Sequence, residues 1–131
     1  MAKTAIKQTR LVEVRKAGKK GRGVFARRDI AKGTEIEKAP VIVLPSQDVF
    51  GYTRTSHLAN YVFNWDKNKF ALALGFGSLY NHSYRPNARY YIEDKDTQVY
   101  FAIADIKKGE EITINYNGKP NSKKDVGFDV A

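Results

Sequence analysis

Turn signals recur so closely along this sequence that only short elements fit between them. Glycine-containing turns are predicted at residues 17–23, 30–34 and 107–110, and polar turns at 66–69 and 94–97. Between the turns, apolar and polar residues mostly alternate, which is typical of β-strands. The sequence therefore predicts a mainly β fold with few short helices, and we expect neither an internal repeat nor a linker.

The predicted strands are short, and they lie around residues 12–15, 24–26, 41–44, 61–65, 70–74, 90–92, 99–103 and 112–116. Val41–Leu44 is an unbroken apolar run between two prolines, which predicts a buried strand. Residues 61–65 fit both helical and strand spacing. The turn at 66–69 and the alternation after it favour a hairpin. Residues 46–57 are polar and predict irregular structure with at most a helical turn.

Length and composition point to one domain. The chain has 131 residues, of which 42% are hydrophobic, so a packed core is expected. It has no cysteine and two histidines, which excludes disulfides and zinc–thiolate sites and argues against a dedicated metal site. No apolar run approaches the ~20 residues of a membrane-spanning helix, and the N-terminus lacks a signal-peptide core. We therefore expect an intracellular protein without a membrane partner.

Charge is distributed unevenly along the chain. The net charge is +9, from 23 basic and 14 acidic residues, and basic residues crowd the first 28 positions. Residues 1–9 are interpreted as a flexible basic arm, and residues 119–131 as a short polar tail. A basic arm is either a solvated surface or a contact for nucleic acid, and the sequence leaves both interpretations open.

One segment places unusual polar side chains among apolar residues. Gly75–Asn87 contains Asn81, His82 and Ser83 directly after Leu79 and Tyr80. Its two glycines permit close backbone approach, and its proline ends regular structure. Buried polar side chains are normally hydrogen-bonded, so taken alone this segment is a loop around a satisfied core histidine. Two other motifs in the sequence favour a functional interpretation instead.

Three separated motifs occur in order. They are Gly21-Arg22-Gly23-Val24-Phe25-Ala26, then Gly77-Ser78-Leu79-Tyr80-Asn81-His82-Ser83 with Pro86-Asn87, then Gly109-Glu110-Glu111-Ile112-Thr113-Ile114-Asn115-Tyr116. Together they resemble the SET domain family of protein-lysine methyltransferases, above all the small stand-alone members of bacteria and large DNA viruses. The resemblance covers residues 10–118. It implies small, curved, β-clip-like sheets with a C-terminal pseudoknot, which would bring the Asn-His-Ser segment beside the last strand.

The resemblance also implies a reaction and its residues. Members of the family move a methyl group from S-adenosyl-L-methionine to a lysine ε-amine, and they need no metal. By resemblance, the catalytic residue is Tyr116, which also contacts the cofactor. The other cofactor-binding residues implied are Lys20, Gly21, Arg22, Gly23, Asn81 and His82. The residues implied to line the substrate-lysine channel are Tyr61, Tyr90 and Ile114. For each of them, a purely structural role in a loop or the core is the alternative.

The sequence departs from the family pattern after Tyr116. Asn117 stands where the family often has glycine, and asparagine tolerates the left-handed backbone that such a turn needs. The tail offers only Phe128 as an aromatic cover for the pocket, so the missing wall is expected either from the tail or from a second subunit in a homodimer. The homodimer stays a hypothesis.

The partner implied by the resemblance is a basic, histone-like or nucleoid protein that exposes a lysine. The expected location is the cytoplasm or nucleoid if the source is bacterial, and the host nucleus if it is viral. The alternative function is a catalytically silent SET-like module that binds nucleic acid or a protein. A third possibility is methyl transfer to the chain's own arm, at Lys3 or Lys7.

Overall fold

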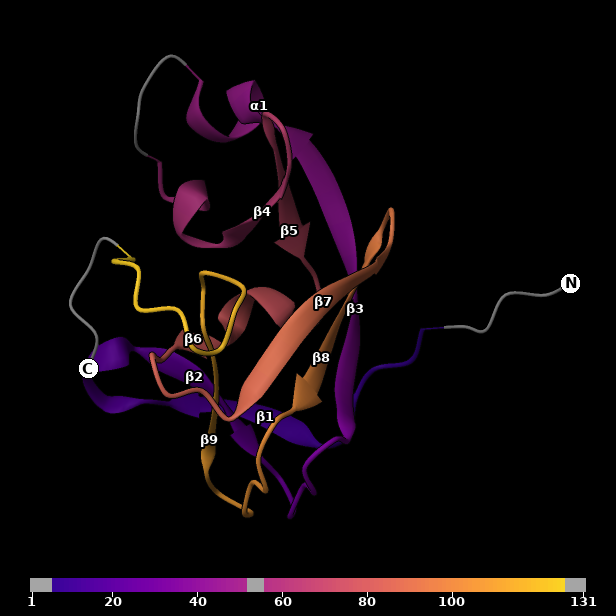
Figure 1. The fold of residues 1–131 in the computed structure, drawn as a ribbon, viewed down its shortest axis with the longest axis vertical. Coiled ribbons are helices and arrows are strands. Elements are labelled where there is room, and N and C mark those ends of the chain that lie inside the picture. The colour runs from indigo at the N-terminus through magenta and orange to yellow at the C-terminus, as the bar shows by residue number, and fades with distance from the viewer. Residues whose placement is uncertain (1–5, 52–55, 127–131) are drawn as a thin grey trace, which may run out of the picture.

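The computed structural model describes residues 6–51 and 56–126 and contains two curled sheets (Figure 1). The first sheet has the order β1 (Val12–Lys16), β2 (Arg22–Ala26), β9 (Glu111–Ile114) and β6 (Asn81–His82). The second has the order β4 (Val62–Asp66), β5 (Lys69–Ala73), β3 (Glu35–Pro45), β8 (Thr97–Ala102) and β7 (Ala88–Asp94). The short helices are η1 (Gly18–Lys20), α1 (Ser46–Phe50), η2 (Leu58–Asn60) and η3 (Gly77–Leu79). This mainly β fold with few short helices confirms the predicted fold class.

Strand β3 runs along one side of the molecule and links its two ends (Figure 1). Its first half pairs with β8, and its second half, from Val41 onward, pairs with β5. The change of partner falls at Pro40, which has no N–H to donate to a sheet. The strand predicted at 41–44 is present, but the prediction that it is buried was wrong, because Val41 alone of these four residues is buried and Ile42 is 47% exposed.

Several local predictions are confirmed, but most strand boundaries move, and β3 begins at Glu35, well before the predicted strand at 41–44. β4 and β5 form the antiparallel hairpin that was favoured over a helix, and α1 supplies the single helical turn. β2 begins at Arg22, so the predicted loop at 17–23 ends early. The last strand ends at Ile114 instead of Tyr116, because Asn115 and the turn after it turn the chain away. Among the described residues, no helix is long and apolar enough to span a membrane.

A short internal repeat contributes strands to both sheets. Residues 24–37 and 100–113 read VFARRDIAKGTEIE and YFAIADIKKGEEIT. Each copy is a strand, a turn and a second strand, and we call the two copies the paired arches. The expectation of no internal repeat was therefore wrong, because the repeat is short and lies half in turns. In the structure β2 of the first arch pairs with β9 of the second, while β8 of the second pairs with β3 of the first.

The turns of the paired arches exchange hydrogen bonds reciprocally. Ile30 N donates to Ile106 O at 2.7 Å, and Ile106 N donates to Ile30 O at 2.8 Å. The carboxylate of Asp105 accepts the N–H of Lys32 at 2.8 Å. In the same way, the carboxylate of Asp29 accepts the N–H of Lys108 at 2.8 Å. Each arch therefore closes the turn of the other.

The Asn-His-Ser segment lies beside the last strand, as the resemblance implied. β6 pairs with β9 in parallel, with Asn81 opposite Thr113 and His82 opposite Ile114. The side chain of Asn87 ties the following loop to the same strand. Its amide nitrogen donates to Glu111 O at 2.8 Å, and its amide oxygen accepts the N–H of Thr113 at 2.9 Å. β9 is thereby held between β2 and β6.

Candidate active site

A cavity of about 530 Å³ lies where the two sheets meet. Its size is within the usual range for a small-molecule site. Five of the predicted site residues line it, namely Lys20, Arg22, Tyr61, Asn81 and Tyr116. Aromatic residues from other elements line the same wall, namely Phe63, Phe70 and Tyr80. The cavity therefore joins two basic residues, three asparagines and several aromatic residues.

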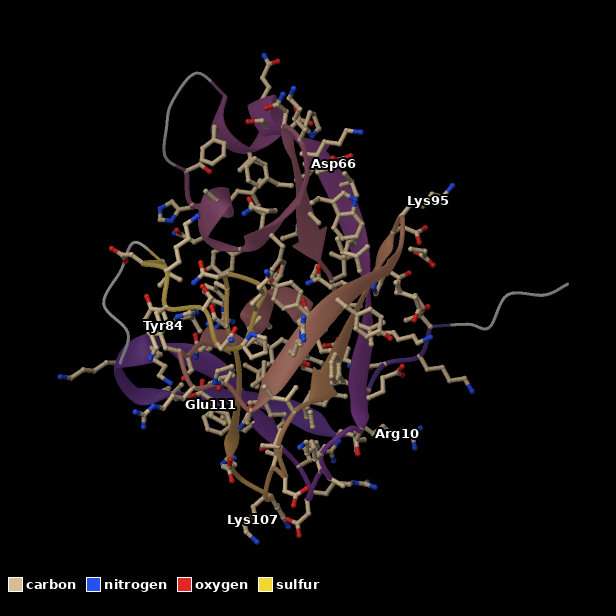
Figure 2. All side chains as sticks on the ribbon, viewed as in Figure 1. Arg10, Asp66, Tyr84, Lys95, Lys107 and Glu111 are labelled. Carbon is tan, nitrogen blue, oxygen red and sulfur yellow. The ribbon has the colours of Figure 1, made fainter. Side chains whose placement is uncertain are left out.

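Glu111 does not line this cavity, but it binds two residues that do. One of its carboxylate oxygens accepts a hydrogen bond from Lys20 Nζ at 2.7 Å, and the other accepts one from Asn81 Nδ2 at 2.7 Å. Asn81 Nδ2 also donates to the main-chain oxygen of Arg22 at 2.8 Å. Sequence reasoning missed Glu111, although it is the second acid of the Gly-Glu-Glu motif before the last strand. Figure 2 shows it on β9, which lies beside β2 and β6.

Gly23 allows this polar cluster to form. A Cβ atom at this position would collide with the carboxylate of Glu111 and would lie 2.9 Å from Asn81 Nδ2. A side chain on Gly23 would therefore push β2 away from Asn81. Gly21 has a φ of 83°, which a residue with a side chain rarely adopts. Neither glycine lines the cavity.

Tyr116 is held at its main chain and at its hydroxyl. Its N–H donates to Nδ1 of His82 at 2.9 Å, and its hydroxyl donates to the main-chain oxygen of Tyr80 at 2.7 Å. His82 is 3% exposed and does not line the cavity. Burial lowers the pKa of His82, so the imidazole stays neutral and its Nδ1 can accept this hydrogen bond. The imidazole thus fixes the backbone of Tyr116.

The phenol groups of the site are shielded from ionisation. Burial, with a smaller effect of the Glu111 charge, raises the pKa of Tyr116 to about 12. Burial also raises the pKa of Tyr90 to about 12. The hydroxyl of Tyr90 donates to the main-chain oxygen of Tyr116 at 3.4 Å, and its ring packs edge-on against Phe63 at 4.9 Å. At neutral pH both groups are therefore neutral hydrogen-bonding phenols.

The remaining channel residues are divided between the rim and the core. Tyr61 follows η2 and is 46% exposed at the cavity. Ile114 is fully buried and pairs with His82, so it lies in the core and does not line the cavity. Tyr90 is half-buried and packs behind the wall through Phe63. The structure brings Tyr61 and Tyr116 to one cavity but does not bring Ile114 there.

The tail folds back onto the site through two asparagines. Asn115 Nδ2 donates to Ser122 O at 2.7 Å, and Asn117 Nδ2 donates to Lys124 O at 2.8 Å. Val126 then lines the cavity. The left-handed position of the turn is taken by Gly118, with a φ of 87°, and not by Asn117. Phe128, the aromatic cover predicted from the sequence, lies outside the described residues.

The family model of the SET domain matches residues 21–117. The chain belongs to the SET domain family. Over 106 residues it is 34% identical to the "H3 lysine-37 specific" histone-lysine N-methyltransferase of Schizosaccharomyces pombe, covering 80% of this chain and 72% of that protein. The crystal structure of a candidate histone methyltransferase from Plasmodium falciparum matches with a TM-score of 0.68 and 30% identity. That match covers 85% of this chain and 95% of the other. These similarities confirm the resemblance and the SET-domain fold expected from the three motifs.

Proposed function

We propose that this SET domain is an S-adenosylmethionine-dependent protein-lysine methyltransferase that acts on a histone-like protein. The observation that supports it best is the neutral hydroxyl of Tyr116, which is held by the Tyr80 carbonyl within a cavity that Asn81, Lys20 and Arg22 also line. The histone methyltransferase relative favours the same reaction class and a protein substrate.

The residues of the cavity fit the cofactor in their chemistry. The amino-acid end of the cofactor carries an ammonium and a carboxylate. Asn81, which Glu111 holds in place, offers its amide to the ammonium, and the cations of Lys20 and Arg22 suit the carboxylate. A purine base suits a wall of aromatic rings. Gly23 supports this arrangement indirectly, because it lets β2 approach Asn81 and Glu111 closely.

Each residue then has a defined task. The bound cofactor supplies an activated methyl group, and the protein aligns the lysine amine with it. The hydroxyl of Tyr116 orients the reacting groups without ionising, because the pKa of this phenol lies far above neutral. The imidazole of His82 is committed to the main chain of Tyr116, so we assign its ligand contacts to its backbone. Tyr61 at the rim and Tyr90 behind Phe63 shape an apolar entrance for the lysine side chain.

An apolar entrance also favours the reactive form of lysine. The amine must lose its proton before it can attack, and its ordinary pKa is about 10.4. Removal from water lowers the pKa of a lysine amine, because the charged form loses hydration. Ile114 is buried and does not line the cavity, so its side chain does not predict how many methyl groups are transferred. Mass spectrometry would measure that number. A histone substrate would place the protein in the nucleus.

The test is methyl transfer from tritium-labelled S-adenosylmethionine to recombinant histone H3. We expect transfer by the unaltered chain and a loss of at least about 100-fold with Tyr116→Phe, which keeps the ring and removes the orienting hydroxyl. The matched control is Tyr91→Phe, since Tyr91 is 46% exposed, contacts Phe101 and lies outside the cavity. This control should retain full activity.

A second measurement separates the cofactor from the substrate. Calorimetric titration with S-adenosylhomocysteine needs no knowledge of the acceptor, and Asn81→Ala should weaken binding because it removes the amide from the polar cluster. Binding without transfer to histone H3 would mean another acceptor, and intact-mass analysis would then reveal transfer to the chain itself. A folded sample that fails to bind would overturn the proposed function and favour a silent binding module.

A further inference from the structure

Glu37 is a buried carboxylate that the proposed reaction does not use. It lies on β3 and is 5% exposed. One oxygen accepts the hydroxyl of Tyr80 at 2.8 Å, and the other accepts the N–H of Phe76 at 2.9 Å. Burial raises the pKa of Glu37, while both hydrogen bonds act in the opposite direction. Burying a carboxyl group costs free energy that an apolar side chain would not cost, so its presence requires an explanation.

The strand is locally reshaped to deliver this side chain. The pairing of β3 with β8 shifts register between Glu35 and Glu37. Ile36 and Glu37, although consecutive, are both buried. The equivalent pairing between the arches is that of β9 with β2. It joins Glu111 to Phe25 and Ile112 to Val24 without a shift in register. Bulges commonly re-aim a side chain beside a functional site. The two arches therefore differ at the position that inserts Glu37.

Glu37 holds one end of the loop that carries Tyr80. Gly75 has a φ of 61°, and a Cβ atom there would collide with the Glu37 carboxylate. The hydroxyl of Tyr100 donates to Gly77 O at 2.9 Å and anchors the middle of the loop. The ring of Tyr80 stacks on that of Tyr100, with centroids 4.7 Å apart. The path of the loop is thus fixed from Gly75 to Tyr80.

Tyr80 joins this buried network to the site. Its side-chain hydroxyl donates to Glu37, and its main-chain oxygen accepts the hydroxyl of Tyr116. A single residue thus transmits the position of the carboxylate to the phenol of Tyr116. Because the acceptor is a backbone atom, substitution of Tyr80 cannot remove it but can move it.

We propose that Glu37 is a positioning residue that sets the Tyr116 hydroxyl through Tyr80. The proposal rests on the proposed methyl transfer for its kinetic consequence, but its structural content is independent of that reaction. Glu37→Gln keeps the shape and places an amide nitrogen opposite one of the two donors. Tyr80→Phe keeps the ring stack and removes only the hydroxyl. We expect each to lower kcat roughly 10-fold and to leave the affinity for S-adenosylhomocysteine within about two-fold.

The matched control is Thr97→Val. Thr97 is 4% exposed on the same sheet, and its hydroxyl bonds Asp96. It should lower thermal stability without changing kcat. If Glu37→Gln fails to fold, Tyr80→Phe tests the same contact. Both substitutions remove the same hydrogen bond between Tyr80 and Glu37. The double variant Glu37→Gln, Tyr80→Phe should therefore lose no more kcat than the stronger single variant.

The effect of Glu37→Gln is also measured in the Tyr116→Phe variant, which distinguishes loss of positioning from a general weakening of the fold. In that background there is no hydroxyl to position, so Glu37→Gln should lower kcat no further. An equal loss in both backgrounds would overturn the proposal. The NMR signal of the Tyr116 Cζ atom, the ring carbon that bears the hydroxyl, reports on this hydroxyl without any substrate. The signal is assigned by its disappearance in Tyr116→Phe.

This signal should move in Glu37→Gln and Tyr80→Phe and stay in place in Thr97→Val. An unmoved Tyr116 signal in both test variants would overturn the proposal even if methyl transfer is present. Absence of methyl transfer by the unaltered chain, together with a moved signal, would overturn only the proposed function.

Discussion

At the scale of single residues, one histidine fixes the backbone on which the site depends. The imidazole of His82 is neutral and buried, and it accepts the main-chain N–H of Tyr116. Its ring also lies 4.4 Å from Tyr84 and 5.1 Å from Tyr116, measured between centroids. Tyr84 is labelled in Figure 2 on the loop that follows β6. His82 therefore links this loop to the chain beyond β9.

Replacing His82 should cost stability as well as activity. His82→Ala leaves the buried N–H of Tyr116 without its acceptor and opens a cavity, so the free energy of unfolding should fall by at least about 2 kcal/mol. Urea denaturation measures this change. His57→Ala, at an exposed position, should stay within about 0.5 kcal/mol of the unaltered chain. Equal effects of the two substitutions would contradict a stabilising role for the hydrogen bond between Tyr116 N–H and His82 Nδ1.

The sequence identified the residues of the site better than their tasks. Asn81 and Tyr116 were predicted from motifs, and both line the cavity. The same motif included His82, whose side chain turned out to bind the protein's own backbone. Side-chain direction depends on neighbouring strands, and a linear motif does not contain that information. Glu111 was missed for the same reason, because its partners are Lys20 and Asn81, far away in sequence.

At the scale of elements, the tail after β9 contributes to the wall of the cavity. Asn115 and Asn117 bind main-chain oxygens of the tail, and Val126 reaches the wall. Asn117, which stands where the family often has glycine, therefore contributes a hydrogen bond that glycine could not make. The departure from the family pattern has a structural role.

Removal of that hydrogen bond should loosen the tail. Asn117→Ala should raise the dissociation constant for S-adenosylhomocysteine about three- to ten-fold, since one lost hydrogen bond is worth about 1 kcal/mol. Calorimetry measures the affinity, and faster proteolysis within residues 119–126 would show the cause. Asn121→Ala, an exposed position in the same tail, is the control. Unchanged affinity in Asn117→Ala would mean that the tail is not part of the ligand site.

The hairpin β4–β5 shows what the sequence could predict at this scale. Alternating residues and a polar turn specify it locally. The length and exposure of β3 could not be predicted in the same way. Its two halves pair with different strands, and the exposure of Ile42 follows from where the second sheet ends. Local pattern determines a hairpin, but only the assembled sheets determine which face of a strand is covered.

At the scale of the whole molecule, the paired arches hold the two sheets together. Asp29 and Asp105 have equivalent positions, and each caps the turn of the other arch. We expect Asp29→Ala and Asp105→Ala to lower the free energy of unfolding by similar amounts, about 1 kcal/mol each. Asp29→Asn and Asp105→Asn keep an acceptor oxygen and should be much less harmful. Urea denaturation of the four variants measures this, and strongly unequal alanine effects would contradict the reciprocal arrangement.

The buried tyrosines predict an alkaline limit to stability. Burial raises the pKa of Tyr90 and Tyr116 to about 12 and shifts those of Tyr80 and Tyr100 upward. The unfolded chain loses these phenolic protons near pH 10, before the folded chain does, so their contribution is complete below pH 10 and falls as pH rises. Tyr90 and Tyr116 should each contribute a loss of roughly 1 kcal/mol by about pH 11. Urea denaturation at about pH 9 and pH 11 measures the loss, and Tyr116→Phe should make it smaller.

Because the paired arches exchange strands, the chain cannot finish either sheet early. β2 lies near the start of the chain, yet its partner β9 begins at Glu111. On a ribosome, β2 must therefore wait with one edge unpaired until almost the whole described chain has emerged. Domains with such distant pairings fold slowly, and unpaired edges favour aggregation. We expect chains truncated before residue 111 to be captured by chaperones during synthesis, whereas chains that extend beyond β9 should escape this capture.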